Sequence, residues 1–383
     1  MTTAWIPHTV ALVGAAGVTG GGRRTKGQET TYSGGFARVF ATALPRLKRL
    51  VLIDQDTTAA QAVVDAIRSK LEERFGDSAA SEFAKITITD DLAAASDAGF
   101  VLEAIPEVLP AKRDLFAKLA IACPDAILAT NTSGLLLDAI VDGLGWSGRS
   151  RAVVCHGFTP THVSPVIEVS RGSATGELTF ARACSIWQLL DKHVLRVAQH
   201  PMHALNFVGT VLWVRLCQLV EEQAVSDSVA DELAKELFRM KIGPFELRRS
   251  TGYRALLSNA ELLHARFPTL AVPDMLRAAV DSGKLPGVAA KEPTPELLAR
   301  HAGVARALTA AYLWSIDYLI STGIVLDPFD ELDWAIEQAL FMSGPRALSV
   351  NLAPAEITQM IDEFRGTFGI GTHHGQLVQV LSP

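Results

Sequence analysis

The stretch TVALVGAAGVTG at residues 9–20 decides the fold class of this chain. Its first five residues predict a buried strand, and glycines follow at once at Gly14, Gly17 and Gly20. A glycine-rich turn after a strand lets the backbone approach a pyrophosphate, and the next helix offers free N–H groups there. The stretch therefore favours a dinucleotide-binding fold, with a plain strand–turn–helix crossover as the alternative.

Asp54 ends the second predicted strand, residues 50–53. An acid at this place hydrogen-bonds ribose hydroxyls and repels a 2′-phosphate, which favours NAD over NADP. Two features depart from the usual pattern: the glycine spacing is GxxGxxG, and 34 residues separate Gly20 from Asp54 instead of about 20. We expect residues 21–35 to form a polar loop that accounts for the excess, and the helix to begin near Phe36.

That loop carries three cations, Arg23, Arg24 and Lys26. They either form a solvated charged surface or reach a phosphate of NADP or of coenzyme A. The sequence leaves both interpretations open.

The first half of the chain alternates short apolar runs with helical patterns. Further strands are predicted at residues 85–89, 99–103, 126–130 and 151–155, with helical segments such as 58–75 between them. Strands that alternate with helices form βαβ units. We therefore expect an α/β domain of the Rossmann type, with a doubly wound parallel sheet.

The pattern changes near residue 200, where strands stop and long helical patterns take over. We expect an NAD-binding domain at residues 1–199 and an all-α region after it, duplicated as 200–290 and 299–383. The two copies share LW, VSD or VLD, DEL, ELF or ALF, and GP, in the same order and about 100 residues apart. Residues 291–295 are the expected linker, and we expect the copies to pack against each other.

The composition excludes several classes of protein. With 49% hydrophobic and 20% charged residues, the chain can bury a sizeable core, which argues against disorder. The net charge of -6 argues against nucleic acid as a partner. The four cysteines form no CxxC pair, so we expect no metal site and a reducing, cytoplasmic location. The N-terminus lacks a signal-peptide pattern, and the apolar residues 204–220 include Arg215, which favours a buried helix over a membrane span.

Five segments carry a resemblance to a known family. They are LEAIPEVLPAKRDLFAKL (residues 102–119), ILATNTSGL (127–135), HGFTPTHVSPVIEV (156–169), IGPFEL (242–247) and DMLRAAVDSGKLPG (274–287). On these segments the sequence resembles the 3-hydroxyacyl-CoA dehydrogenases, in the longer type with two tandem C-terminal helical domains. The resemblance implies reversible, NAD-dependent oxidation of an L-3-hydroxyacyl-CoA to a 3-oxoacyl-CoA.

The resemblance also implies the catalytic residues. The family's general base falls on His156, its orienting carboxylate on Glu168, and its substrate-contacting serine and asparagine on Ser133 and Asn206. A histidine titrates near neutrality, so it can take the alcohol proton while a hydride leaves the carbon. A carboxylate on the other ring nitrogen fixes the tautomer, and hydrogen-bond donors stabilise the changing charge on the oxygen. Taken alone, His156 would equally fit a core histidine, and residues 131–133 a turn or helix cap.

Glu107 and Lys112 match a segment that lies beside the nicotinamide in the family. The resemblance therefore adds them to Gly14, Gly17, Gly20 and Asp54 as cofactor-binding residues. A surface ion pair is the alternative for these two side chains.

The sequence departs from the family around the catalytic residues. Gly157 follows His156 where the family has phenylalanine, Thr159 replaces asparagine, and Phe207 follows Asn206 in place of arginine. The changes indicate either neutral divergence or an altered acyl or carrier pocket. A dehydrogenase of a free or differently carried 3-hydroxy acid is therefore one alternative, and a non-catalytic nucleotide-binding protein is another. A homodimer is compatible with the sequence.

Overall fold

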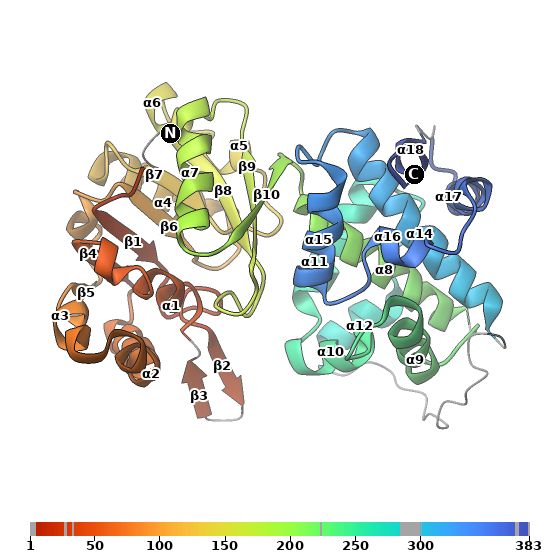
Figure 1. The fold of residues 1–383 in the computed structure, drawn as a ribbon, viewed down its shortest axis with the longest axis horizontal. Coiled ribbons are helices and arrows are strands. Elements are labelled where there is room, and N and C mark those ends of the chain that lie inside the picture. Colours follow the sequence, from red (N-terminus) through yellow and green to blue (C-terminus); the bar gives the residue numbers. More distant parts are fainter. Residues whose placement is uncertain are drawn as a thin grey trace. The chain divides into compact units, whose positions relative to one another are not determined.

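The structure is a computed structural model that describes residues 5–26, 29–32, 34–222, 224–283, 299, 301–371 and 375–381. Its contacts divide the chain into two units, Met1–Gln199 and His200–Pro383. The first unit contains all the described strands, whereas the described residues of the second unit form only helices, turns and loops (Figure 1).

The first unit is built on an eight-stranded sheet in the order β10-β9-β8-β7-β6-β1-β4-β5. Its strands are β1 Thr9–Val13, β4 Arg49–Ile53, β5 Ile86–Thr89, β6 Phe100–Glu103, β7 Ile127–Thr130, β8 Ala152–Gly157, β9 Val166–Arg171 and β10 His193–Ala198. The expected Rossmann-type α/β fold is confirmed. One detail of the prediction was wrong, because β9 runs antiparallel to β8. A short connection without a crossover helix joins these two strands, which is enough for an antiparallel pair but not for a parallel one.

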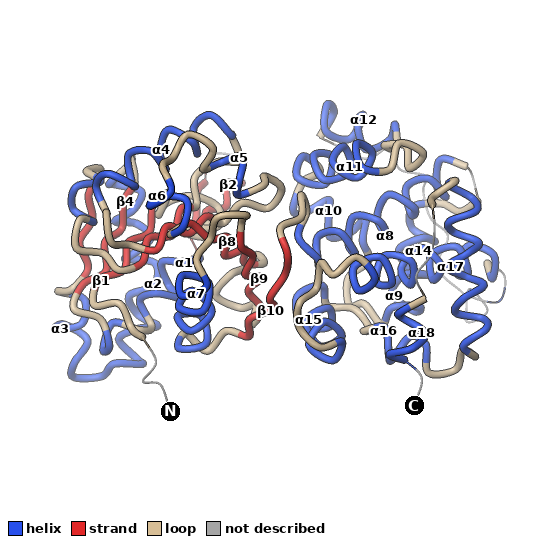
Figure 2. Tube along the Cα trace, turned by 90° about the horizontal axis from the view of Figure 1, so that it is seen from above, coloured by secondary structure: helices blue, strands red, loops and turns tan. Residues whose placement is uncertain are grey.

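Helices cover both faces of the sheet, because the sheet strands are buried on both sides (Figure 2). One core lies under α1, α2 and α7 and contains Phe36, Phe40 and Trp187; the other lies under α4 and α5 and contains Phe116 and Leu137. The helices of this unit are α1 Gly35–Ala41, α2 Thr57–Phe75, α3 Ala79–Phe83, α4 Leu109–Ala122, α5 Leu137–Ile140, α6 Trp146–Ser150 and α7 Glu177–Leu189, with short 3-10 turns at Leu44–Arg46, Gly76–Ser78 and Leu92–Ala95.

The polar loop expected at residues 21–35 contains a hairpin. Strands β2 Arg23–Lys26 and β3 Glu29–Tyr32 pair antiparallel, separately from the main sheet, and β3 lies beside α2 (Figure 1). The helix after the hairpin, α1, begins at Gly35, as expected. The sequence did not predict the hairpin, because neither RRTK nor ETTY has an apolar face.

The regular elements of the second unit, among its described residues, are helices joined by turns and loops. Its helices are α8 His203–Glu221, α9 Asp227–Phe238, α10 Pro244–Thr251, α11 Arg254–Arg266, α12 Asp274–Ser282, α14 Ala302–Ser321, α15 Phe329–Leu340, α16 Pro345–Ser349, α17 Pro354–Phe368 and α18 Gln376–Leu381. The expected linker at residues 291–295 lies outside the described residues.

The repeat seen in the sequence corresponds to a repeated structure. Helices α9 and α15 have 12 residues each, and each is followed by a residue in the left-handed region, Arg239 (φ 53) and Phe341 (φ 54). In both copies an aspartate then accepts backbone N–H groups at the start of the next helix. Asp231 accepts from Phe245 and Glu246, and Asp333 accepts from Arg346.

The two copies pack against each other within the second unit. Helix α8 lies against α14, and the Phe207 and Trp314 rings are 5.8 Å apart. The Phe238 and Tyr312 rings, 5.4 Å apart, add a second contact between the copies. Helix α8 is long and apolar enough to span a membrane, but most of its residues are buried among the other helices of this unit. It is therefore a core helix, as the sequence predicted.

Candidate active site

His156 and Glu168 face each other across two neighbouring strands. The antiparallel register of β8 and β9 places the two residues opposite one another. His156 Nδ1 lies 3.0 Å from Glu168 Oε2, and the two residues are 5% and 0% exposed. A buried carboxylate needs a partner, and here the imidazole is one. The arrangement fixes the ring's orientation and directs its other nitrogen, Nε2, away from the carboxylate.

The turn that carries Ser133 is fastened next to the strand of His156. Strands β7 and β8 are parallel neighbours, with Thr130 opposite Val154. Just beyond this register, the Asn131 side-chain oxygen accepts the Gly157 N–H at 2.9 Å. The predicted catalytic residues therefore lie near the C-terminal ends of adjacent strands, with Ser133 just after β7 and His156 in the last two residues of β8. Sequence reasoning treated Asn131 only as part of a turn and missed this connection.

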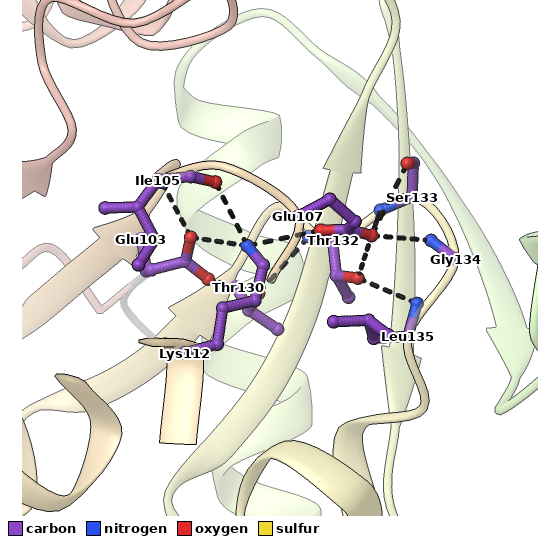
Figure 3. A network of polar contacts seen from close by, with 9 residues as sticks. All are labelled: Glu103, Ile105, Glu107, Lys112, Thr130, Thr132, Ser133, Gly134 and Leu135. Atoms are coloured by element: carbon purple, nitrogen blue, oxygen red, sulfur yellow. Dashed lines mark hydrogen bonds and ion pairs between the residues drawn. The ribbon is translucent and has the colours of Figure 1, made fainter. Parts of the chain in front are cut away.

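Glu107 holds the Ser133 turn in place (Figure 3). Its Oε1 accepts the Thr132 hydroxyl at 2.5 Å and the N–H groups of Ser133 and Gly134 at 2.9 Å each. Burial raises the pKa of Glu107, but the Lys112 charge and these hydrogen bonds outweigh that effect and lower it below its ordinary value. Glu107 is thus held as a carboxylate, and its hydrogen bonds order the turn at residues 132–134.

Lys112 is buried and joins Glu107 to a second carboxylate, Glu103 (Figure 3). Lys112 Nζ lies 2.6 Å from Glu103 Oε1 and 3.3 Å from Glu107 Oε2, and the Lys112 side chain is only 1% exposed. Glu103 is 0% exposed, and it also accepts the Ile105 N–H and the Thr130 hydroxyl. The alternative of a surface ion pair is therefore wrong for Lys112. Glu103, at the end of β6, is a residue of this network that sequence reasoning missed.

The glycine turn follows β1, in the middle of the sheet. A Cβ at Gly14 would lie 2.8 Å from the Ala104 backbone, and one at Gly20 would lie 2.1 Å from the Gly14 carbonyl oxygen. Both positions therefore require glycine. Asp54 directly follows β4 and lies beside the turn, where its Oδ2 accepts the Ala16 N–H at 2.8 Å. A half-buried carboxylate at this edge fits the ribose end of a dinucleotide.

The turn itself, rather than α1, provides the free N–H groups. Among the described residues, no acceptor is found for the backbone N–H groups of Val18, Thr19 and Gly20. By contrast, the N–H groups of Phe36 and Ala37, in the first turn of α1, donate to the Thr19 and Gly20 carbonyl oxygens. The expectation that the helix after the loop offers free N–H groups was wrong for these two. Three successive free N–H groups beside Asp54 nevertheless fit the pyrophosphate of NAD.

The remaining predicted site residue, Asn206, belongs to the other unit. It lies in the first turn of α8 and is half-buried. In the described part of the chain, no group of three or more His, Cys, Asp or Glu residues is arranged to hold a metal ion.

Comparison with known proteins identifies this architecture. Residues 31–200 match the family model described as "3-hydroxyacyl-CoA dehydrogenase, NAD binding domain". Residues 31–200 are therefore similar to the NAD-binding domain of the 3-hydroxyacyl-CoA dehydrogenases. NAD is the cofactor that this domain binds.

Individual relatives differ in what their names say they act on. A 3-hydroxyadipyl-CoA dehydrogenase of Escherichia coli K12 is 27% identical over 224 residues, which cover 57% of this chain and 46% of that protein. The chain thus spans about half the length of this relative. An L-carnitine dehydrogenase of Streptomyces coelicolor is 31% identical over 223 residues, 57% of this chain and 65% of that protein. The crystal structure of 3-hydroxybutyryl-CoA dehydrogenase from Escherichia coli K12 has the same fold, with a TM-score of 0.79, 18% identity and 98% coverage of both chains.

Proposed function

We propose that the chain catalyses the reversible, NAD-dependent oxidation of an L-3-hydroxyacyl-CoA to a 3-oxoacyl-CoA. The buried pair of His156 and Glu168 carries this proposal, because a histidine oriented by a carboxylate is the arrangement that moves a proton reversibly near neutral pH. The match of residues 31–200 to the family model supports the proposal. The proposal adds roles for individual residues to the chemistry of the family.

In the oxidation, the alcohol loses a hydride from carbon and a proton from oxygen. NAD supplies the hydride acceptor when it is bound. His156 takes the proton on Nε2, since Nδ1 faces Glu168, and the carboxylate stabilises the imidazolium that forms. In the reverse direction the same imidazolium returns the proton to the oxygen of the 3-oxo group.

Ser133 is proposed to donate a hydrogen bond to the reacting oxygen. Its backbone is fixed by Glu107, so its hydroxyl is presented from a rigid turn next to the strand of His156. A donor that is ordered before the reaction begins stabilises the developing charge without a cost of reorganisation. Asn206 is proposed as a second donor from the helical unit, where α8 holds it in a buried helical segment.

A second candidate substrate has one observation in its favour. A relative named L-carnitine dehydrogenase is 31% identical to this chain, as is a relative named probable 3-hydroxybutyryl-CoA dehydrogenase. Carnitine is a free 3-hydroxy acid, so the same proton and hydride transfer would apply without a coenzyme A carrier. Gly157 and Thr159, which depart from the family pattern directly after His156, lie where a changed pocket would be expected.

Initial rates with a series of substrates test the proposal. NADH oxidation by the purified protein would be followed with acetoacetyl-CoA, with acetoacetate and with 3-dehydrocarnitine. We expect kcat/KM to be at least about tenfold higher for acetoacetyl-CoA, because recognition of the carrier supplies binding energy to the transition state. A preference for either free acid would transfer the proposal to the second candidate. NADH binding without turnover of any of the three would contradict both.

A further inference from the structure

The β2–β3 hairpin interrupts a helix that would otherwise be continuous. The N–H of Gly21 donates to the Gly17 carbonyl, as in the first turn of an α-helix. Two later bonds of the same pattern are made across the hairpin, from the Phe36 N–H to the Thr19 carbonyl and from the Ala37 N–H to the Gly20 carbonyl. Gly35 therefore occupies the place that directly follows Gly21.

Residues 22–34 are thus an insertion of 13 residues after the first helical turn. Without them, the separation of Gly20 and Asp54 falls from 34 residues to 21, close to the usual value of about 20. The insertion leaves the glycine turn itself intact. It places a charged hairpin directly after the glycine turn, whose Val18, Thr19 and Gly20 N–H groups have no acceptor among the described residues.

The base of the hairpin forms one wall of a small cavity. The cavity is lined by Val18 of the glycine turn, by Arg23 and Arg24 of β2, and by the loop Thr159, Pro160 and Thr161 that follows His156. Lys192 anchors this loop, since its buried Nζ donates to the Thr161 and Ser164 carbonyl oxygens at 2.8 and 2.5 Å. The cavity is therefore a built feature of the first unit, with a glycine turn, a cationic strand and an anchored loop around it.

The charge around this cavity is positive and uncompensated. In the described part of the chain, no ion pair or side-chain hydrogen bond is found for Arg23 or Arg24. Burial lowers the pKa of His162 to about 4, and the charges that add to this effect all belong to cations: Arg38, Lys70, Lys192 and Arg24. Several cations without carboxylate partners create a potential that attracts an anion.

We propose that this cavity holds a phosphate group of a bound ligand, with Arg23 and Arg24 as its charged donors. Guanidinium groups match phosphate oxygens in pairs, and the neighbouring turn adds backbone N–H groups. Two ligands of the proposed function carry phosphate groups, the dinucleotide and the coenzyme A of the thioester. The proposal rests on the proposed function for this choice of ligands, but its test does not depend on turnover.

Equilibrium binding to the purified full chain separates the two sources. Dissociation constants would be measured for NADH, coenzyme A and pantetheine, which lacks the phosphates of coenzyme A. The variants are Arg24→Glu and the double variant Arg23→Ala/Arg24→Ala. The matched control is Lys48→Glu, which makes the same charge change at an exposed residue. Lys48 precedes β4, so it lies at the N-terminal ends of the strands, opposite the end where the glycine turn follows β1.

We expect the Arg24→Glu variant to bind one phosphate-bearing ligand at least about tenfold more weakly, the size of effect that a charge-assisted hydrogen bond produces. A loss confined to NADH assigns the cavity to the dinucleotide. A loss for coenzyme A but not for pantetheine assigns it to the carrier. Changes of less than about twofold for both NADH and coenzyme A, or an equal loss in Lys48→Glu, would overturn the proposal.

Deletion of residues 22–34 provides a second, independent variant. The helical hydrogen bonds from Phe36 and Ala37 already bridge the insertion, so joining Gly21 to Gly35 is expected to leave a folded domain. The deletion protein should show the same selective loss of binding as the double arginine variant. A folded deletion protein that binds both ligands as tightly as the unmodified chain would also overturn the proposal. A failure of the proposed function would appear instead as absent turnover with these binding constants unchanged.

Discussion

The first unit holds two buried pairs of an acid and a base, and they differ in what surrounds them. Glu103 accepts hydrogen bonds on both oxygens, from Lys112 and Ile105 on one and from Thr130 on the other. His156 and Glu168 pair between two strands at the strand end, next to the Ser133 turn. The first pair is built into a fixed network, whereas the second combines an orienting acid with an imidazole whose other nitrogen, Nε2, faces away from that acid. Burial of an acid–base pair therefore does not by itself mark a catalytic site.

The largest effect is expected from changing the carboxylate that orients the histidine. Glu168→Gln keeps the volume but removes the charge that stabilises the imidazolium. By analogy with other histidine–carboxylate pairs, we expect kcat to fall by on the order of 10³- to 10⁴-fold without unfolding. Steady-state rates and circular dichroism measure this, and the exposed Glu73→Gln is the control. A loss of less than about tenfold would assign the Glu168 contact to structure alone.

Breaking the other pair should act on stability instead. Lys112→Met leaves Glu103 buried without its cation, which typically costs about 3–5 kcal/mol of unfolding free energy. The double variant Lys112→Met/Glu103→Met removes both charges and should recover part of that loss. Urea unfolding measures the two values. Glu103→Met completes the cycle. If the double variant lost at least as much stability as the two single variants together, the pair would not be the source of the effect.

Ser133→Ala tests whether the turn between the Glu103–Lys112 pair and the His156–Glu168 pair takes part in the reaction. The substitution removes the hydroxyl but keeps the backbone N–H that donates to Glu107. We expect kcat to fall by about 10²- to 10³-fold, the usual effect of losing one donor to a developing oxyanion. The unfolding free energy should stay within about 0.5 kcal/mol. Unchanged kinetics would remove Ser133 from the proposed mechanism.

The smallest effect is expected at Glu107, whose pKa is lowered in the folded protein. A carboxyl group with a lowered pKa stabilises the fold above its ordinary value near 4.5, and this contribution disappears as the pH falls through the lower, folded value. Since the side chain is 37% exposed, the contribution at pH 7 should be below about 1 kcal/mol. The stability difference from Glu107→Gln should therefore shrink between pH 7 and pH 3 in urea titrations. A stability difference between the two proteins that stays constant with pH would contradict the lowered pKa of Glu107.

Much of this organisation could be predicted from the sequence. The strands that follow period and turn rules were placed correctly, and the pairing of His156 with Glu168 was expected from the family resemblance. The repeated helices were visible because each copy ends α9 or α15 in the same way, before a Gly-Pro start of the next helix. Strand periodicity and helix-end signals are caused by residues close together in the sequence, so a single sequence is enough to predict them.

Other features could not be predicted, because they depend on contacts between distant residues. Glu103 ends a buried strand, and the rule that buried acids are paired applied to it as it did to Glu168, but its partner Lys112 was visible only in the fold. The hairpin has no apolar face and therefore no periodic signal. The interrupted helix became clear only from the hydrogen bonds of Phe36 and Ala37 across the insertion.

The second helical copy shows that a shared sequence pattern does not imply a shared catalytic role. The shared LW pair aligns the two copies with an offset of 101 residues, which places Ala307 opposite Asn206. The polar residue proposed for catalysis thus occurs in the first copy alone. The shared aspartate caps at Asp231 and Asp333 explain the common fold, and they say nothing about chemistry.

The most direct test of the account is the rate of NADH oxidation with acetoacetyl-CoA by the unmodified chain, His156→Ala and the exposed-histidine control His8→Ala. The account predicts turnover by the unmodified chain and by His8→Ala, with a loss of about 10²- to 10⁴-fold in His156→Ala and NADH binding retained in all three. Equal rates in His156→Ala and the unmodified chain would contradict it, because the proton would then move without the histidine that Glu168 orients.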